Sequence, residues 1–398
     1  MILAHLADLH LGFRQFHAQT PAGINQREAD VASAFTRCVE AIVATTPDLV
    51  VVAGDVFHSA RPSNLALVHA VRQFQRLVSA CPVVVVAGNH DSPRASDAGH
   101  PLSLLAALGV QVVLSEPTRV RVGDVAVWCV PDTGVPQPLR LEPDPHARYN
   151  VALIHGEVAG VIKGAPEKPH EIQPNTLAGD GWDYIALGHY HTRQQVAPCA
   201  WYAGAPEFTS SNPWAEIGEP KGGLLADLAS HTVAPLDVPS VRRFVDLPRL
   251  SASGVTPAQL VEQIDAHAGD LSGAVVRQVV TDCDVLVSRE VSRTALRRWR
   301  RSSLHFAFDA RRPDVPVMAG QARNQRSRRS LAEMLADVLV RRAELSGLAP
   351  DALLAAGTRY LDEVGAVSTH DHIAEEFTDD NTERAASEYI PGPEDKAA

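Results

Sequence analysis

The sequence predicts an α/β fold, because strongly apolar, strand-like runs alternate with amphipathic segments along its first half. Short apolar runs that end abruptly in polar residues occur five times before residue 230. Runs of this length are typical of strands that are buried on both faces, as in parallel sheets. The segments between the first three runs have helical spacing, which gives the order strand, helix, strand, helix, strand.

Each of the five runs ends in side chains that can bind a metal ion. In parallel sheets ligands gather beyond the carboxyl ends of the strands, so we expect these polar ends to meet. The runs are MILAHLADLH (1–10), DLVVVAGD (48–55), PVVVVAGNHD (82–91), NVALIHGE (150–157) and DYIALGHYH (183–191).

Two helices are predicted between these strands. The first carries Val31, Ala34, Phe35, Cys38 and Ile42 on one face. The second carries Leu67, Val71, Phe74 and Val78, with Ser63 as its N-cap.

The chain of 398 residues is too long for one core, so we expect several units. Residues 1–237 form the predicted catalytic domain, and residues 241–312 a small α+β domain with a helix at Pro257–Ala268 and the strand AVVRQVVTD. Pro313, Pro316 and Gly320 indicate a linker. Residues 318–365 are predicted to be helical, over Leu331–Leu345 and Ala352–Val364, and the acidic tail 366–398 to be disordered.

Composition indicates a globular protein, since 45% of the residues are hydrophobic. Five scattered cysteines without a C-x-x-C pair argue against a disulfide framework and a zinc ribbon. The absence of a long apolar run argues against a membrane span, and Asp8 and His10 against a signal peptide, so a cytoplasmic location is expected.

The net charge of −11 is unsuited to a nucleic-acid binder, but the charge is unevenly distributed. Residues 289–329 hold twelve arginines against three acids, whereas residues 362–395 hold eleven acids. Arg297, Arg298, Arg300 and Arg301 flank Trp299, a pattern that suits phosphate contact with base stacking. A solvated helix face is the alternative interpretation.

The polar ends together supply what a hydrolytic two-metal site requires: Asp, Asn and His ligands and a carboxylate able to bridge two ions. Asp8 and His10 are two residues apart. Gly54 and Gly88 each allow a tight turn at the end of a strand, which lets the next side chain point into the site. A ligand set without Cys fits Mn²⁺ or Mg²⁺ better than a structural zinc site, although iron and zinc stay open.

The blocks DLH, GDVFH, GNHD, HGE and GHYH resemble the motifs of the calcineurin-like metallophosphoesterase superfamily. The resemblance implies a four-layer αββα sandwich with two facing sheets. It also implies that Asp55 bridges two ions and that His90 is a catalytic histidine outside the ligand set. The implied ligands of one ion are Asp8, His10, Asp55 and His191, and those of the other are Asp55, Asn89, His155 and His189.

The stretches LGFRQFH, NQREADVASAF and GDVFHSARPS resemble the bacterial SbcD and archaeal DNA double-strand-break repair nucleases over roughly residues 1–230. This implies a Mn²⁺-dependent exonuclease and endonuclease acting on duplex ends and hairpins, with His58 as a second active-site histidine and a capping domain over the DNA. Where many members carry Ser, this chain has Ala205.

The same resemblance implies an SMC-like ATPase partner called SbcC, which binds the C-terminal helical region, and a homodimer. The partner-binding residues would be Leu331, Met334, Leu335 and Val338, and the dimer surface residues 25–45 with the helix after Ser63. Packing of residues 331–345 on their own domain is the alternative.

The role of His90 and the activity of the chain stay open from the residues. His90 either acts as general acid and charge stabiliser or only orients Asp8 or Asp55, and His58 is expected to position phosphate. The chain could instead be another dinuclear phosphoesterase (a cyclic-nucleotide phosphodiesterase, a pyrophosphatase or a phosphatase), or a scaffold without activity. Those alternative enzymes give no reason for the appended arginine-rich and helical regions.

Overall fold

The computed structural model describes residues 1–93, 99–132, 141–161, 171–177, 179–313, 336, 339 and 351–360. The chain divides into one compact unit over residues 1–313 and a second over residues 314–398. Within the described ranges, no helix is long and apolar enough to cross a membrane.

The first sheet contains three of the five predicted strands. Strands β1 (Ile2–Leu6), β2 (Leu49–Ala53), β3 (Val83–Val86) and β4 (Gln111–Val113) are parallel, in that order. Strands β11 (Gly222–Asp227) and β12 (Thr232–Asp237) extend the sheet beyond β1 as an antiparallel pair. The predicted parallel arrangement is therefore confirmed, and the carboxyl ends of β1, β2 and β3 lie at one edge.

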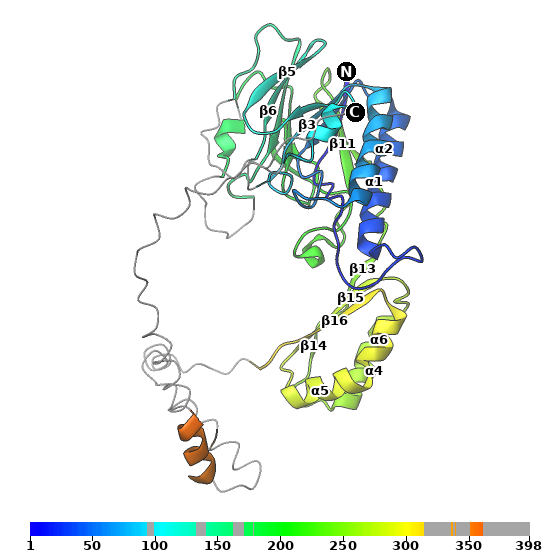
Figure 1. Ribbon diagram of the computed structural model, residues 1–398, viewed down its shortest axis with the longest axis vertical. Helices are drawn as coiled ribbons and strands as arrows, with labels where there is room; N and C mark the ends of the chain where they lie inside the picture. The colour runs from blue at the N-terminus through cyan, green and yellow to red at the C-terminus, as the bar shows by residue number, and fades with distance from the viewer. Residues whose placement is uncertain are drawn as a thin grey trace, which may run out of the picture. The chain divides into compact units, whose positions relative to one another are not determined.

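Helices α1 (Gln26–Thr45) and α2 (Asn64–Ala80) cover one face of this sheet, as Figure 1 shows. Their buried side chains include Val31, Phe35 and Phe74, as the helical spacing predicted. The hydroxyl of Ser63 accepts a hydrogen bond from the Ala66 N–H at 3.1 Å, so the predicted N-cap is confirmed. A short helix, α3 (Ser103–Ala106), precedes β4.

The second sheet packs against the opposite face of the first. Its order is β5 (Thr118–Val122), β6 (Val125–Val130), β7 (Tyr149–His155), β8 (Tyr184–Gly188), β10 (Ala200–Tyr202) and β9 (Gln194–Ala197). Val51 and Val84 of the first sheet meet Val127 and Leu153 of the second in a fully buried core. The expected pair of facing sheets is confirmed. Of the described residues, a 3-10 helix, η1 (Pro174–Leu177), packs on the outer face of the second sheet, rather than an α-helix.

Residues 244–310 form a separate sheet with three helices, and we call this unit the cap. Strands β13 (Phe244–Asp246) and β14 (Leu250–Ser251) pair with one edge of β15 (Val275–Thr281), and β16 (His305–Ala310) pairs with the other. Helices α4 (Pro257–Ala268), α5 (Val285–Thr294) and α6 (Leu296–Ser302) lie between strands along the chain. All four strands are parallel, so the expected small α+β unit has a parallel sheet, with one helix before β15 and two helices before β16. A second 3-10 helix, η2 (Pro213–Glu216), precedes β11.

Of the predicted C-terminal helices, the structure describes Ala336, Leu339 and residues 351–360, all of them helical. The proposed partner-binding residues Leu331, Met334, Leu335 and Val338 lie outside the described residues, as does the acidic tail.

The loops that follow β2 and β3 are held together by Asp91, whose side chain is fully buried. Its carboxylate accepts hydrogen bonds from the backbone N–H groups of Val56 at 3.1 Å, Phe57 at 2.8 Å and Gly88 at 3.0 Å. Buried N–H groups need such partners, because leaving one unpaired costs free energy. Asp91 therefore fixes the two loops that carry the polar ends of the strands.

We expect Asp91→Ala to lower the free energy of unfolding by about 3 kcal/mol, because it leaves three buried donors unpaired. Urea unfolding followed by circular dichroism measures this. Asp124→Ala, at an exposed position, is the matched control and should change stability by less than about 0.5 kcal/mol. Equal effects of the two changes would contradict the role given to Asp91.

Candidate metal centre

The loops after β1 and β2 are paired through their backbones just beyond the sheet. The N–H of Asp8 donates to Gly54 O at 3.1 Å, and that of His10 to Asp55 O at 2.9 Å. Asp8, His10 and Asp55 have φ values of 53°, 46° and 52°, in the left-handed region that non-glycine residues rarely adopt. Such strain persists where the surroundings impose it, and it often marks functional sites. Here positive φ values fall on four of the predicted ligands, because His189 has a φ of 119° as well.

Two glycines make room for predicted ligands that lie against them. A Cβ atom on Gly54 would lie 2.3 Å from His155 Nδ1, and one on Gly88 would lie 2.2 Å from Asp55 Oδ1. The expected turn is seen at Gly54, which has a φ of +78°. The main requirement at both positions is space, since any side chain there would displace a predicted ligand.

Asp8, His10 and His191 form the first ligand group, with one ligand atom of each within 4.8 Å of the others. His10 Nε2 and His191 Nε2 are 3.0 Å apart. Burial and the neighbouring His191 hold the pKa of His10 well below its usual range, and burial and Lys221 lower the pKa of His191 to about 3. The two imidazoles are therefore neutral, and a shared cation fits between their ring nitrogens.

Asp8, Asp55 and His155 form the second group, again within 4.8 Å of one another. His155 Nδ1 donates to Ala53 O at 2.8 Å, which leaves Nε2 directed at Asn89 Oδ1, 3.1 Å away. Neutral histidine has one donor and one acceptor nitrogen, so this bond presents the lone pair of Nε2 to the site.

His189 approaches the same place from the end of β8. Its backbone N–H donates to both carboxylate oxygens of Asp8, at 3.2 and 3.1 Å. Its Nε2 lies 3.1 Å from Glu157 Oε1, so Nδ1 is the nitrogen left for an ion. A carboxylate on the far nitrogen of a ligating histidine fixes the ring and raises its basicity.

Asp55 lies between the two groups. Its Oδ2 is 3.6 Å from His10 Nε2 and 3.7 Å from His155 Nε2. Ligands with bonds of about 2.0–2.2 Å to a common ion lie roughly 3–3.5 Å apart, so small adjustments would let Asp55 share an ion with each histidine. Asp55 is thus placed between two histidines that could each hold an ion with it.

The charges of the site also favour cations. Burial raises the pKa of Asp8 to about 7, with a further contribution from Asp55. Burial alone would lower the pKa of His155, but Asp55 and Asp8 raise it. Buried carboxylates are costly without neighbouring positive charge, and divalent ions would supply that charge.

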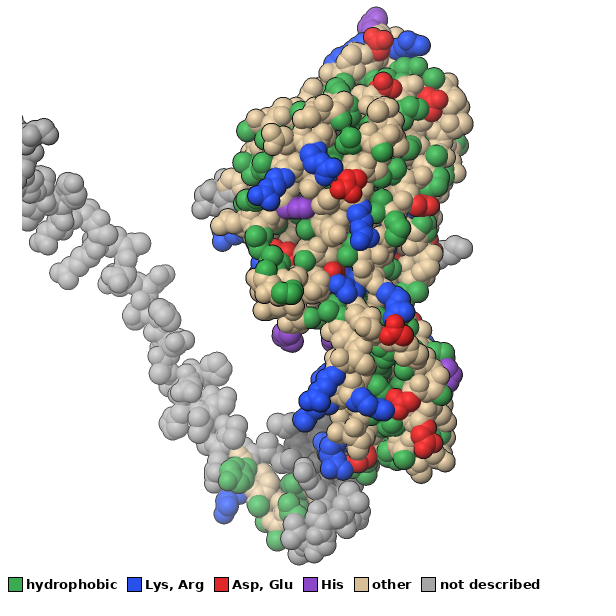
Figure 2. All heavy atoms as spheres, turned by 90° about the vertical axis from the view of Figure 1, so that its right-hand side faces the viewer, with side chains coloured by type: hydrophobic (Ala, Val, Ile, Leu, Met, Phe, Trp, Pro, Cys, Tyr) green, Lys and Arg blue, Asp and Glu red, His purple; other side chains and the backbone are tan. Residues whose placement is uncertain are grey.

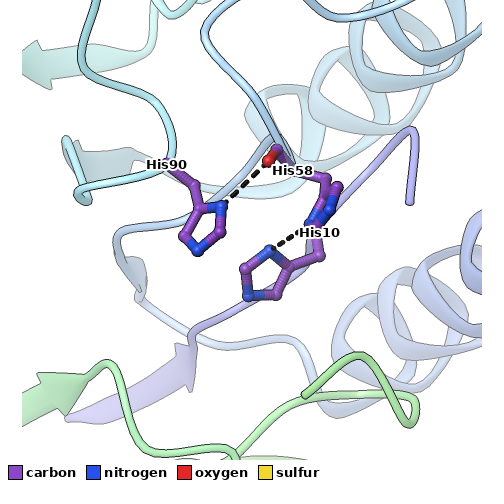
Figure 3. A group of neighbouring side chains, drawn as sticks. All are labelled: His10, His58 and His90. Atoms are coloured by element: carbon purple, nitrogen blue, oxygen red, sulfur yellow. Dashed lines mark hydrogen bonds between the residues drawn. The ribbon is translucent and has the colours of Figure 1, made fainter. Parts of the chain in front are cut away.

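His10, His58 and His90 form a third cluster, which Figure 3 shows. His90 Nδ1 donates to the His58 carbonyl at 2.9 Å, and His58 Nδ1 lies 3.3 Å from His10 Nδ1. With His10 Nε2 as ligand, His10 Nδ1–H would donate to His58, which puts the remaining proton of His58 on Nε2. His58 then offers an N–H, and His90 offers a lone pair or, once protonated, an N–H.

The structure thus brings together all nine residues predicted for the metal ligands and the catalytic histidines. It adds two residues that the sequence analysis missed, Glu157 behind His189 and Thr209, whose Oγ1 lies 3.3 Å from His191 Nδ1. Glu157 was visible as the last residue of HGE, whereas nothing in the sequence marked Thr209. At Ala205 the backbone N–H binds the His191 carbonyl at 3.1 Å, a contact that needs no serine hydroxyl.

The basic segment of the cap differs from expectation at its aromatic residue. Trp299 is only 2% exposed, stacks on Phe306 and donates to Asp265 Oδ1 at 2.7 Å, so the prediction that it stacks on bases is wrong. Its apolar ring is needed in the core of the cap. Arg298 pairs with the same Asp265 at 2.5 Å.

Arg297, Arg300 and Arg301 are exposed and have no ion pair among the described residues. Figure 2 shows basic and acidic side chains interspersed over the face that it displays. Within residues 297–301, an electrostatic contact with a large anion would therefore rest on these three arginines.

We expect Gly88→Ala to abolish binding of at least one Mn²⁺ ion, because the new methyl group displaces the Asp55 carboxylate. Isothermal titration calorimetry gives the number of ions and their affinities. Gly99→Ala is the matched control, since its Cβ would meet nothing within 4 Å. Two ions bound by Gly88→Ala with unchanged affinity would contradict the geometry described here.

Comparison with known proteins gives a family match over the part of the chain that contains the predicted ligands. The model of the calcineurin-like phosphoesterase family matches residues 1–193. The DNA double-strand break repair protein Mre11 of Methanopyrus kandleri is 32% identical over 230 residues, covering 52% of this chain and 49% of that protein. The Mre11 protein of Archaeoglobus fulgidus is 36% identical over 215 residues, covering 48% and 46%.

The chain spans about half the length of the curated relatives it matches. The family match at residues 1–193 includes most strands of the two facing sheets. The family match therefore lies in the domain that holds the candidate metal centre. Residues 1–193 thus match the calcineurin-like phosphoesterase family, and about half of the chain is similar to Mre11 repair proteins of archaea.

Proposed function

We propose that this protein is a two-metal DNA exonuclease and endonuclease of double-strand-break repair, acting at duplex ends and hairpins. The observation that carries the proposal is Asp55 Oδ2, placed 3.6 Å from His10 Nε2 and 3.7 Å from His155 Nε2. The names of the related proteins support DNA as the substrate.

The ligand sets follow from the two groups around Asp55. We assign Asp8, His10, Asp55 and His191 to one ion, and Asp55, Asn89, His155 and His189 to the other. Two Mn²⁺ ions fit this mixture of oxygen and nitrogen donors, with Mg²⁺ as the alternative. When bound, such a pair polarises the phosphoryl oxygen and lowers the pKa of a water that attacks in line.

His90 and His58 act on the substrate beside the ions. The bond from His90 Nδ1 to the His58 carbonyl directs Nε2 of His90 away from that bond, so the protonated ring can donate there to the leaving oxygen. Burial lowers the pKa of His58, which keeps this ring neutral, and its Nε2–H can hold a nonbridging phosphate oxygen. His90 is thus the general acid, and His58 positions the phosphate.

Three exposed arginines of the cap, Arg297, Arg300 and Arg301, would contact the DNA backbone. Arg298 would also contact it, although it forms an ion pair with Asp265.

A homodimer is supported by the groove between α1 and α2. Its lining includes Leu65 and Val68, which are 52% and 48% exposed.

We assign binding of an SMC-like SbcC ATPase to the C-terminal region. Deleting residues 318–398 should abolish binding of that ATPase while metal-dependent activity remains.

The test is Mn²⁺-dependent cleavage of an end-labelled duplex, with and without an SbcC-type ATPase. We expect Asp8→Ala to abolish cleavage through loss of metal, and His90→Ala to slow it by about 10²–10⁴-fold while both ions still bind. His231→Ala is the matched control, because that side chain is 63% exposed and is not among the ligand groups.

Cleavage that survives Asp8→Ala would overturn the mechanism. Intact DNA together with hydrolysis of bis-p-nitrophenyl phosphate would retain the metal centre and favour the second candidate, another dinuclear phosphoesterase.

For the cap, we expect the triple change Arg297→Ala, Arg300→Ala and Arg301→Ala to weaken duplex binding. The slope of its salt dependence should fall by about 0.9 for each phosphate that the variant no longer neutralises. Fluorescence anisotropy at several salt concentrations measures both. Hydrolysis of bis-p-nitrophenyl phosphate should not change. Arg293→Ala is the control, since Arg293 pairs with Glu290 at 2.9 Å. An unchanged salt slope in the triple variant would exclude these arginines from the DNA interface.

A further inference from the structure

A buried network of charged residues joins α1 to the start of the cap. Arg27, in the first turn of α1, is fully buried and donates to Asp30 Oδ2 at 2.8 Å and to Phe208 O at 2.7 Å. Arg242 donates two bonds to the same Asp30, at 2.6 and 2.9 Å. These bonds hold the pKa of Asp30 below its usual value although burial alone would raise it. Asp30 therefore links two arginines from distant parts of the chain.

Glu207, which is 1% exposed, makes the corresponding link on the other side of Arg27. Its Oε2 accepts from the Val241 N–H at 2.7 Å, and its Oε1 accepts from Ser240 Oγ at 3.0 Å. Ser240 and Val241 lead directly into the first strand of the cap. Phe208, the next residue, packs its ring on Phe244 of that strand, with centroids 4.4 Å apart.

The same short segment reaches the metal centre. Thr209 is 5% exposed, and its Oγ1 lies 3.3 Å from Nδ1 of His191, one of the proposed ligands. With His191 Nε2 toward the ion, Nδ1 carries the proton and donates it to Thr209. Residues 207–209 thus contact Val241 before the cap, Arg27 of α1 and the Nδ1 side of His191.

We propose that Glu207 and Thr209 are positioning residues. They fix the orientation of the His191 ring and couple it to residues 240–241, where the cap is attached. This inference rests on the proposed metal centre. Because Glu207 is bound to Val241 while Thr209 is bound to His191, displacement of one end of the segment moves the other. Linkage then requires the reciprocal effect: an ion that orders His191 also stabilises the bonds of Glu207 to the cap.

The first experiment is calorimetric titration with Mn²⁺. Thr209→Val keeps the shape of the side chain and removes the acceptor, so we expect about 10- to 100-fold weaker binding of one of the two ions. Thr209→Ser should restore the affinity of the wild type. Glu207→Gln replaces one of two acceptor oxygens by an amide donor, at a place where Ser240, Val241 and Arg27 all donate. We expect about tenfold weaker binding of the same ion, although Glu207 touches no ligand.

Asp265→Asn is the matched control, because it makes the same chemical change inside the cap, where Asp265 binds Arg298 and Trp299. It should leave both affinities unchanged. If Thr209→Val and Glu207→Gln bind both ions as tightly as the wild type, or if Asp265→Asn weakens binding as much as Glu207→Gln does, the inference is wrong.

Hydrogen exchange on the wild-type protein provides a second test that requires no variant. We expect Mn²⁺ to slow exchange of the Val241 amide by about tenfold, relative to the Ala252 amide, which is bonded inside the cap to Thr281 O at 2.9 Å. Equal protection of the two amides would overturn the coupling. A wild-type protein that binds no Mn²⁺ would instead overturn the proposed function itself.

Discussion

The position of the Asp55 carboxylate is the constraint on which the rest of the site depends. One oxygen of this side chain lies between the ring nitrogens of His10 and His155, and the other accepts the backbone N–H of His90 at 2.9 Å. The first sheet contributes Asp55 and His10, and the second contributes His155. Two divalent ions that share Asp55 would therefore join the two sheets at the edge where their strands end, and would balance carboxylates that burial otherwise disfavours.

The local structure around Asp55 is arranged to hold it in an unfavourable conformation. Its positive φ, the close approach of Gly88 and the three hydrogen bonds accepted by Asp91 all constrain the same two loops. Strain at these positions is offset by the extensive core between the sheets and helices, where most side chains are fully buried. The buried core thus stabilises the fold, and the loops that follow the strands hold the predicted metal ligands.

Much of this was predictable because apolar runs and helical spacing report burial directly. The five strands that end in the predicted ligands, both covering helices and the helix Pro257–Ala268 were predicted. The structure brings the nine predicted site residues together. The role of Trp299 was not predictable, because an aromatic residue among arginines has the same local pattern whether it faces a base or a core. Arg27, Glu207 and Thr209 could not be found either, since their contacts join segments about 180 residues apart or depend on a single side chain.

A crystal structure with Mn²⁺, analysed by anomalous scattering, would show whether two ions share Asp55. We expect two peaks roughly 3.5–4 Å apart, both within bonding distance of Asp55, one beside His10 and His191 and the other beside His155 and His189. A single peak, or two peaks that Asp55 does not bridge, would contradict this arrangement.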